Sequence, residues 1–288
     1  MRINIKGLRA TGFHGVREFE RRDGQEFVVD VTLKRPTPWA DALPATVNYS
    51  EIADTVIDVI QGPPFDLIET LGQEIAGRLL RERPSVHMVK VAVHKPNAPL
   101  KVEFGDVVCR VKRRRRDCPA TGFVLSLGSN LVDPDKHRDL DENLRLALHA
   151  LAATPGIDLT ACSSVYRTTP VEVGSERQPD FHNLVVMGLT TLEPHELLRQ
   201  TASVEQRLGR TRPYPHAPRV IDIDIVKFGD AVIHDDELTI PHPRASQRGF
   251  VLTPWIEIAP HAKLPEGSLT ELVPKLGPET VEKIAPIW

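Results

Sequence analysis

Two aspartates interrupt the most strand-like run of the 288-residue chain, the segment PRVIDIDIV at Pro218–Val226. Side chains alternate across a β-strand, so Asp222 and Asp224 should share one face of a sheet while the isoleucines face the other way. Aspartate is disfavoured in strands and neighbouring like charges repel, so this arrangement costs free energy unless a cation neutralises it. Mg²⁺ takes oxygen ligands and is often shared with substrate phosphates, so the spacing indicates a magnesium site, with a solvated sheet face as the alternative.

Arginines precede the two aspartates in the same stretch of sequence. Arg210, Arg212 and Arg219 belong to it, and its segment 209–215, GRTRPYP, is rich in turn formers. A guanidinium group can hold phosphate oxygens through two parallel hydrogen bonds. Carboxylates beside arginines are typical of metal-assisted phosphoryl transfer. Because the chain has no GxxxxGK[ST] loop, we expect a nucleotide site of another design.

Helices and strands alternate on both sides of a basic segment, so we expect two α+β domains. Apolar periodicity in the second part predicts helices at 139–153 and 194–208, and strands at 159–167, 183–191 and 220–228. The first part reads as strands at 2–9 and 26–33, a helix capped by Ser50, a helix at 67–83, and strands at 89–93 and 102–111 with a bulge at Gly105. The predicted domains are 1–112 and 122–288, joined by a linker at 113–121.

The composition is that of a packed soluble enzyme, with 41% hydrophobic and 26% charged residues and a net charge of −3. No global positive charge would recruit nucleic acid or a membrane surface, and no apolar run approaches the roughly 18 residues of a membrane span. The first residues lack a signal-peptide core and the three cysteines form no CxxC pair, so we expect a cytoplasmic protein. The one basic run, Lys112–Arg116, is interpreted as a solvated linker rather than a nucleic-acid patch.

Five motifs of the second part occur in an order that resembles a known family. They are LSLGSNL at 125–131, SSVYRT at 163–168, PDFHN at 179–183, RVIDIDI at 219–225, and PH at 241–242 followed by RGF at 248–250. Together they resemble 6-hydroxymethyl-7,8-dihydropterin pyrophosphokinase, which implies a ferredoxin-like α+β fold. The resemblance also implies that the pterin hydroxymethyl oxygen attacks the β-phosphorus of ATP and that AMP leaves.

The same resemblance assigns roles to residues at the matching positions. Asp222 and Asp224 would hold two Mg²⁺ ions against ATP. The residues that would contact the pterin are Phe181, Phe250, Asn183 and Thr168. Catalytic roles fall to Arg210 and Arg219. ATP binding falls to Arg212, His242, Arg248 and Glu205, although Glu205 also fits a surface salt bridge.

One loop departs from the family pattern. The stretch between Gly209 and Arg219 is one residue shorter than the pattern and lacks its usual tryptophan. Tyr214 or His216 is expected to take the place of that tryptophan over the pterin.

Candidates in the first part lie at the ends of predicted elements. Tyr49, Glu69 and Lys95 each stand where a strand or helix meets a loop. A structural role remains open for each of them. An acid such as Glu69 in the first turn of a helix is favoured by the helix dipole alone, and Lys95 before a stiff proline turn could simply be a solvated side chain.

The motifs around these residues resemble a second family, dihydroneopterin aldolase, over residues 1–112. They are GFHG at 12–15, GQEFVVDV at 24–31, VNY at 47–49, LIETL at 67–71 and HKPNAP at 94–99. The resemblance implies a T-fold, which is an antiparallel sheet with two helices. Subunits of that fold join their sheets into barrels with sites at the interfaces, and an uncovered sheet edge also favours assembly. We therefore expect a homo-oligomer formed through this domain.

The aldolase resemblance implies proton-transfer roles for Lys95 and Tyr49 with an ordered water, and a further active-site acid at Glu20. Glu69 and Ile68 would bind the pterin edge. No metal or other cofactor is implied in this domain. The leading hypothesis is therefore a bifunctional folate-biosynthesis enzyme, a lyase followed by an ATP-dependent transferase. Two alternatives stay open: a pyrophosphokinase with a non-catalytic pterin-binding or oligomerising module, and a nucleotidyltransferase of unknown acceptor.

Overall fold

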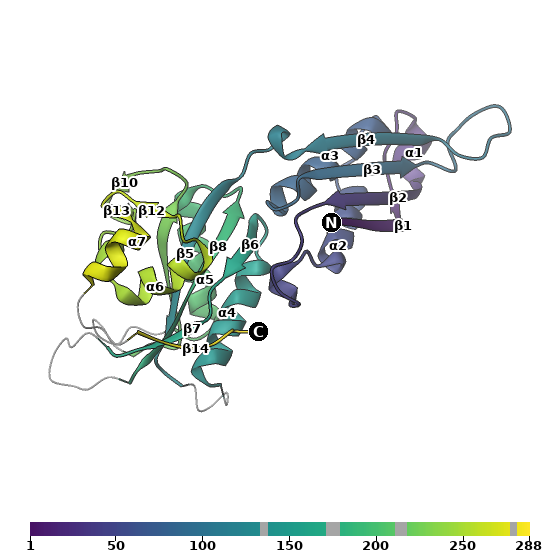
Figure 1. The fold of residues 1–288 in the computed structure, drawn as a ribbon. Coiled ribbons are helices and arrows are strands. Elements are labelled where there is room, and N and C mark those ends of the chain that lie inside the picture. The colour runs from purple at the N-terminus through teal and green to yellow at the C-terminus, as the bar shows by residue number, and fades with distance from the viewer. Residues whose placement is uncertain (133–137, 171–178, 211–217, 277–280) are drawn as a thin grey trace. The chain divides into compact units, whose positions relative to one another are not determined.

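A computed structural model describes residues 1–132, 138–170, 179–210, 218–276 and 281–288 (Figure 1). The chain divides into two compact units. Unit 1 comprises Met1–Thr37 and Thr46–Ala120, and unit 2 comprises Pro38–Ala45 and Thr121–Trp288. Each unit has a hydrophobic core of its own.

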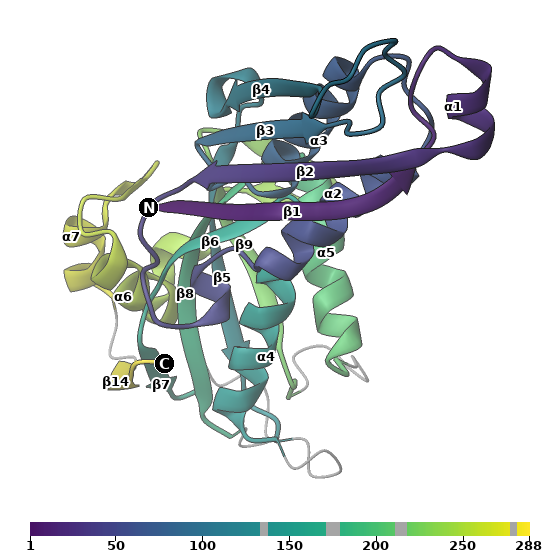
Figure 2. The same cartoon turned by 90° about the vertical axis from the view of Figure 1, so that its right-hand side faces the viewer.

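Unit 1 is a four-stranded antiparallel sheet with two helices packed on one of its faces (Figures 1 and 2). The strands, in spatial order, are β1 (Arg2–Gly12), β2 (Gln25–Lys34), β3 (Met88–His94) and β4 (Val108–Arg114). The helices are α2 (Tyr49–Gln61) and α3 (Ile68–Glu82), and the short α1 (Glu18–Asp23) connects β1 to β2. This is the antiparallel sheet with two helices that the T-fold resemblance implied.

Alternation along β2 explains why the helices cover one face of this sheet. Phe27, Val29, Val31 and Leu33 are buried, whereas the residues between them are partly exposed. The apolar stripes of α2 and α3 pack into the same core. Burying each of these side chains contributes about 1.5–3 kcal/mol relative to leaving it in water.

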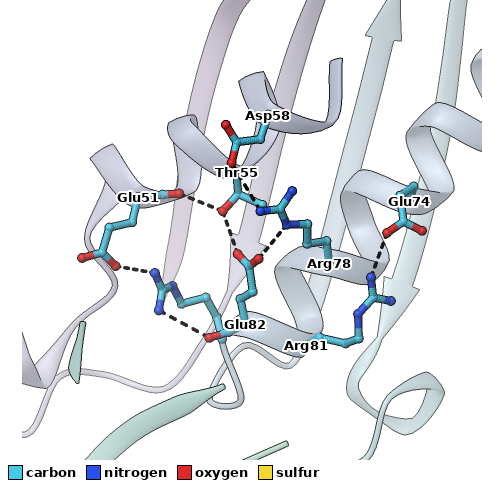
Figure 3. Close-up of polar contacts among 8 residues, drawn as sticks. Glu51, Thr55, Asp58, Glu74, Arg78, Arg81 and Glu82 are labelled. Atoms are coloured by element: carbon cyan, nitrogen blue, oxygen red, sulfur yellow. Dashed lines mark hydrogen bonds and ion pairs between the residues drawn. The ribbon is translucent and has the colours of Figure 1, made fainter. Parts of the chain in front are cut away.

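Helices α2 and α3 run antiparallel and are joined by side-chain contacts along their length (Figure 3). Near the start of α2, Glu51 pairs with Arg83, which directly follows α3. Further along α2, Asp58 Oδ2 lies 3.3 Å from Arg78 Nη2. Because α2 has 13 residues, its first residue, Tyr49, lies about 18 Å from its last. Tyr49 therefore stands at the opposite end of the helix pair from the first turn of α3.

Two local predictions for unit 1 are wrong. Asn48 rather than Ser50 caps α2, because the Asn48 side chain accepts a hydrogen bond from the Ser50 backbone N–H at 3.0 Å. The last strand begins at Val108 rather than Val102, and Gly105 lies in the connecting loop. The ladder stops because His94 pairs with Val108, the Lys95 N–H makes one last bond to the Val107 carbonyl oxygen at 2.9 Å, and Pro96 has no N–H to continue it.

The basic run belongs to β4 and to the turn that follows it, and its Lys112, Arg114 and Arg116 side chains are exposed. Its first residues continue β4 to Arg114, and Arg115 begins the 3-10 turn η2 (Arg115–Asp117). The Arg115 guanidinium donates to the carbonyl oxygens of Leu80 at 2.7 Å, Arg83 at 2.8 Å, Val86 at 3.2 Å and Cys118 at 2.7 Å. Carbonyls at and beyond the end of a helix have no partner within the helix, so Arg115 supplies donors that α3 lacks. Unit 1 thus extends through the predicted linker to Ala120.

Unit 2 is built on an antiparallel sheet in the order β14-β7-β8-β5-β9, with β6 paired to β8. Its strands are β5 (Thr121–Ser129), β6 (Ile157–Cys162), β7 (Val165–Thr168), β8 (Phe181–Thr190), β9 (Asp222–Phe228) and β14 (Val281–Ala285). Its larger helices are α4 (Leu140–Ala152), α5 (Pro194–Arg207) and α6 (Gly249–Ile258). The spatial order β7-β8-β5-β9, with α4 and α5 as connections, is the expected ferredoxin-like arrangement.

Smaller elements complete unit 2, and one predicted strand proves to be two. The small elements are η1 (Leu43–Ala45), β10 (Ile233–His234), β11 (Thr239–Ile240), η3 (Ala245–Gln247), β12 (Lys263–Leu264), β13 (Gly267–Ser268), α7 (Leu269–Leu272) and η4 (Val273–Lys275). The strand predicted at 159–167 is divided into β6 and β7. Across the described ranges, no helix combines the length and the apolar character needed to cross a membrane.

Both faces of the unit 2 sheet are covered by helices. Leu125 and Ile223 belong to the core that includes α4 and α5, whereas Val124 belongs to a separate core with α6. Alternation along β9 then places Asp222 and Asp224 on the α6 side of the sheet. The predicted separation of the acids from the isoleucines is confirmed.

A segment from the first half of the chain belongs to unit 2. Pro38–Ala45 includes η1, and Trp39 packs against the core of α4 and α5. The Trp39 indole N–H donates to the Leu159 carbonyl oxygen on β6 at 3.2 Å. Unit 2 is therefore assembled from two stretches of sequence rather than from 122–288 alone.

Candidate active sites

Each aspartate of β9 contacts an arginine. Asp222 Oδ1 lies 2.5 Å from Arg210 Nη2, and Asp222 Oδ2 lies 2.5 Å from Arg219 Nη1. Asp224 Oδ2 lies 3.3 Å from Arg248 Nη1. The arginines offset part of the repulsion between the two carboxylates.

Glu205 connects α5 to the same strand. Its Oε1 accepts a hydrogen bond at 2.6 Å from the backbone N–H of Ile223, the residue between the two aspartates, and its carboxylate pairs with Arg210. Burial raises the pKa of Glu205, and the Arg210 guanidinium acts in the opposite direction. Glu205 is only 7% exposed, so its contacts are not those of a surface salt bridge. It fixes both Arg210 and the backbone that carries the acids.

Arg248 links Asp224 to the start of α6. Its guanidinium lies 5.3 Å from the ring centre of Phe250 and its Nη1 lies 3.4 Å from His242 Nε2. His242 Nε2 in turn lies 3.8 Å from Asp224 Oδ2. Burial lowers the pKa of His242, while the neighbouring Asp224 raises it. Two predicted ATP ligands, a predicted pterin contact and an acid therefore lie in one cluster.

The other predicted pterin contacts lie on neighbouring strands. Asn183 on β8 and Asp222 on β9 both pair with Gly128 on β5, from its two sides. At a strand spacing of about 4.8 Å, their Cα atoms are about 10 Å apart. Asn183 Nδ2 donates to Thr168 Oγ1 at 2.7 Å, and Thr168 pairs with Phe181 across β7 and β8. The pterin candidates and the acids therefore share one face and one end of the sheet.

Gly128 keeps this face open between the two groups. A Cβ atom at this position would lie 2.6 Å from Asn183 Oδ1 and 3.9 Å from Phe181 Cδ1. Because Nδ2 of Asn183 is committed to Thr168, its Oδ1 is the atom that points over the glycine. A larger side chain at 128 would collide with that amide.

Asn130 is a site residue that the sequence did not single out. Its buried Oδ1 accepts a hydrogen bond from the Arg219 backbone N–H at 2.8 Å. The backbone N–H groups of Asn130 and Leu131 both donate to the Arg219 carbonyl oxygen at 3.1 Å. Asn130 stands in the motif LSLGSNL, which gave it no role of its own, and the available signal was an amide side chain directly after a buried strand. The structure shows that this segment clamps the backbone of Arg219.

The carboxylates of β9 offer the oxygen donors that a hard cation takes. In the described parts of the chain, no group of three or more His, Cys, Asp or Glu side chains could hold a metal ion. A magnesium ion on Asp222 and Asp224 would therefore take its remaining ligands from phosphate oxygens and water. Arg212 lies outside the described residues, and so do Tyr214 and His216.

A buried ion pair forms the second candidate site, in unit 1. Lys95 Nζ, directly after β3, lies 2.5 Å from Glu20 Oε1 on α1, and both side chains are buried. Gln25 Nε2 donates to the same oxygen at 3.2 Å, and the Arg17 backbone N–H donates to Glu20 Oε2 at 3.0 Å. Burial would raise the pKa of Glu20, but these hydrogen bonds, that from Lys95 above all, hold it below its ordinary value. A lysine held in this way is suited to moving a proton at a bound substrate.

The other predicted residues of unit 1 do not join this pair. Ile68 and Glu69 form the first turn of α3, where Glu69 is exposed. Tyr49 begins α2 at the opposite end of the helix pair and is 70% exposed. Within the described residues, no hydrogen bond or ion pair connects Tyr49 or Glu69 to Lys95.

Comparison with known proteins assigns both halves of the chain. Residues 3–112 match the dihydroneopterin aldolase family, and residues 124–260 match the 7,8-dihydro-6-hydroxymethylpterin-pyrophosphokinase family. Over 117 residues the chain is 44% identical to dihydroneopterin aldolase of Streptomyces coelicolor, covering 40% of this chain and 98% of that protein. Over 164 residues it is 40% identical to 2-amino-4-hydroxy-6-hydroxymethyldihydropteridine pyrophosphokinase of Methylorubrum extorquens, covering 57% of this chain and 99% of that protein. The chain belongs to both families.

The two families make this chain an enzyme in both of its domains. A solved structure of E. coli dihydroneopterin aldolase in complex with neopterin resembles the aldolase domain at 25% identity, covering 39% of this chain and 98% of that chain with a TM-score of 0.36. One domain belongs to a lyase family and the other to a transferase family of folate biosynthesis that uses ATP and magnesium. The predicted bifunctional enzyme is confirmed, and a non-catalytic amino-terminal module is not favoured.

Proposed function

We propose that the chain performs two consecutive steps of folate biosynthesis. The aldolase domain would cleave 7,8-dihydroneopterin into 6-hydroxymethyl-7,8-dihydropterin and glycolaldehyde. The pyrophosphokinase domain would then transfer diphosphate from ATP to the hydroxymethyl group and release AMP. The presence of both families in one chain carries this proposal, because the pterin product of the first reaction is the substrate of the second.

The Lys95–Glu20 pair supports proton transfer in the aldolase domain. Cleavage removes the hydroxyl proton of the second side-chain carbon and breaks the bond between the first two side-chain carbons. The electron pair of that bond stays on the first carbon, where the pterin ring delocalises it, and a proton then completes the hydroxymethyl group. Lys95, held 2.5 Å from Glu20, would move these protons together with Tyr49 and an ordered water. Because the ring stores the electrons, the proposal uses no metal or other cofactor in this domain.

Pterin binding is proposed for the first turn of α3. The Glu69 carboxylate would accept hydrogen bonds from the guanidine-like edge of the ring, beside Ile68. Glu69 is exposed, which supports this role. Among the described residues, no cationic side chain forms an ion pair with its carboxylate.

The position of Tyr49 supports a site completed by a second copy of the chain. Tyr49 lies about 18 Å along α2 from the end of the helix pair that carries Glu69. Exposed apolar side chains near Glu20 in the sequence, including Phe13, Val16 and Phe19, offer a surface for that copy. The uncovered edges of β1 and β4 would allow the sheets to join. We therefore propose a homo-oligomer in which Tyr49 and Lys95 of one site come from different chains.

Mixing of inactive variants tests this arrangement. Oligomers formed from Tyr49→Phe and Lys95→Ala chains should regain aldolase activity that neither variant has alone, because some sites would combine the two intact residues. As the matched control, Glu20→Ala mixed with Lys95→Ala should regain nothing, since those two residues meet within one chain. Recovery in neither mixture would mean that Tyr49 and Lys95 act within the same chain.

In the pyrophosphokinase domain, we propose that Asp222 and Asp224 hold two Mg²⁺ ions. Bound magnesium would offset the charge of the ATP phosphates as the hydroxymethyl oxygen attacks the β-phosphorus. Arg210 and Arg219 would shift from Asp222 to the transferring phosphates, because they already lie within contact distance of this carboxylate.

The remaining side chains of the cluster divide between the two substrates. His242 and Arg248 would hold the other ATP phosphates, together with Arg212, and Glu205 would keep Arg210 in place. The pterin would lie between its predicted contacts Phe181, Phe250, Asn183 and Thr168, with Asn183 Oδ1 accepting from the ring edge.

The products released by the second domain test the proposal. With 6-hydroxymethyl-7,8-dihydropterin, ATP and Mg²⁺, the chain should form AMP and a pterin diphosphate. Formation of ADP would indicate transfer of a single phosphate. Release of inorganic pyrophosphate would indicate a nucleotidyltransferase, so either outcome would overturn the proposed reaction.

A further inference from the structure

His14 is buried, and the backbone of one segment engages both of its ring nitrogens. The Phe65 backbone N–H donates to Nδ1 at 3.0 Å, and Nε2 lies 2.8 Å from the Ile60 carbonyl oxygen. A backbone amide can only donate and a carbonyl oxygen can only accept. These partners therefore require a neutral ring with its proton on Nε2.

The loop around His14 is attached to the same segment by further contacts. The Gly15 backbone N–H donates to the Phe65 carbonyl oxygen at 2.9 Å, and Arg21 Nε donates to the Gly15 carbonyl oxygen at 2.9 Å. At Gly12, a Cβ atom would lie 2.7 Å from the Ile60 carbonyl oxygen and 2.8 Å from His14 Cδ2. Gly12 thus leaves room for the His14 ring and for the Ile60 carbonyl oxygen, to which the ring donates.

The glycine after the histidine makes room for the candidate catalytic acid. Gly15 has a φ of +144°, and a Cβ atom there would lie 2.3 Å from Glu20 Oε2. The Arg17 backbone N–H, two residues further on, donates to that same oxygen at 3.0 Å. The backbone that His14 anchors is therefore the backbone that positions Glu20, which in turn holds Lys95.

The ring of His14 packs on two aromatic side chains, one of which also contacts Lys95. It stacks on Phe65 with ring centres 5.5 Å apart and meets the edge of Phe27 at 5.3 Å. Lys95 Nζ lies 5.9 Å from the ring centre of the same Phe27. Burial lowers the pKa of His14, the hydrogen bond to Ile60 raises it, and the nearby charges of Lys95 and Arg21 lower it further.

We propose that His14 is a positioning residue of the aldolase site, whose neutral Nε2–H tautomer ties the Gly12–Arg17 loop to the segment Ile60–Phe65 and thereby places Glu20 against Lys95. The inference rests on the proposed aldolase activity. The role of His14 is indirect, because among the described residues no hydrogen bond joins His14 to Glu20 or to Lys95. Loss of the two ring hydrogen bonds would leave an N–H and a carbonyl buried without partners, and the loop would shift to satisfy them.

Two substitutions test the hydrogen bonds of the ring. His14→Phe keeps a flat aromatic side chain, slightly larger than imidazole, and removes both hydrogen bonds, so the kcat of glycolaldehyde release should fall roughly ten- to hundredfold, the scale of misplacing a catalytic group by about an ångström. KM for dihydroneopterin should change little, because the proposed pterin contacts, Ile68 and Glu69, lie on α3 and not in the loop that His14 anchors. His14→Gln retains one donor and one acceptor on its amide and should recover part of the lost kcat.

Matched controls show whether the loss of kcat comes from the position of Glu20 and Lys95 rather than from general damage to the protein. His87 lies in the same unit and is exposed, so His87→Phe should leave kcat unchanged. Each variant should form AMP from supplied 6-hydroxymethyl-7,8-dihydropterin at the wild-type rate, and thermal melting fixes a temperature at which all are folded. Wild-type kcat in His14→Phe, or no difference between His14→Phe and His14→Gln, would overturn the proposal.

A measurement on the wild-type chain tests the tautomer without using activity. Nitrogen-15 NMR at neutral pH should show His14 as a neutral ring protonated on Nε2. A proton on Nδ1, or a charged imidazolium, would overturn the inference even if the chain releases glycolaldehyde. Conversely, a chain with this tautomer but no glycolaldehyde release would refute the proposed function, and with it any positional role in that reaction.

Discussion

Asp222→Ala is expected to abolish AMP formation, lowering its rate by about a thousandfold or more, while glycolaldehyde release stays near the wild-type rate. The substitution removes one of two carboxylates proposed to hold magnesium, and such an ion stabilises phosphoryl charge by several kcal/mol, each ~1.4 kcal/mol being tenfold in rate. It also removes the carboxylate that lies between Arg210 and Arg219. Measuring AMP and glycolaldehyde in the same sample checks both halves of this prediction.

Three further variants test whether the loss comes from removing a metal-binding carboxylate. Asp222→Asn keeps the shape and removes the charge, so it should be as inactive as the alanine variant. Asp224→Ala should behave alike, because one carboxylate cannot hold two cations. As the matched control, Asp230→Ala changes a fully exposed aspartate just after β9, whose carboxylate lies 3.6 Å from Lys227 Nζ, and should keep full activity. ATP-dependent turnover in Asp222→Ala would refute the metal assignment.

Lys95→Ala should slow aldol cleavage by roughly two to four orders of magnitude, the usual share of a positioned acid–base group. It should also leave the buried Glu20 without its strongest hydrogen-bond donor, so the pKa of this carboxyl group should rise from its wild-type value. Pterin affinity should change little, because Glu69 and Ile68 supply the proposed contacts. Single-turnover release of glycolaldehyde and equilibrium binding of the pterin measure the two effects separately.

The control for Lys95 is an exposed lysine of the same unit. Lys101 lies in the loop between β3 and β4, and Lys101→Ala should retain both cleavage and binding. If pterin binding collapses in Lys95→Ala while the domain stays folded, then Lys95 anchors the substrate and another group transfers the proton.

Periodicity predicted the elements that bury one clear face. Helices α4 and α5 and the first three strands of unit 1 appear close to their predicted positions because each contributes an apolar stripe to a core. The short α1, with the sequence EFERRD, offers no such stripe and was not predicted. The sequence of α6, GFVLTPWIEI, is apolar on nearly every side and contains a proline, so it has no helical period to detect.

Within the sites, we could predict residues whose arrangement follows from their spacing on one strand. We could not predict residues whose partners lie far away in the sequence. Asp222 and Asp224 share a face because they are two residues apart on one strand. Asn130 clamps a backbone 89 residues away, and His14 bonds to backbone atoms 46 and 51 residues away. Only the fold brings such partners together. Arg115 is a similar case, since its place in a basic run gave no sign that it caps α3.

One time course tests most directly whether a single chain carries both reactions. The purified wild-type protein is given dihydroneopterin, ATP and Mg²⁺, and glycolaldehyde and AMP are followed in the same sample. Glycolaldehyde should appear first, AMP should follow after a lag, and both should reach the same final amount, with a chelator abolishing only the AMP. AMP formation that requires added 6-hydroxymethyl-7,8-dihydropterin, with no glycolaldehyde at any time, would contradict the assignment of two consecutive activities to this chain.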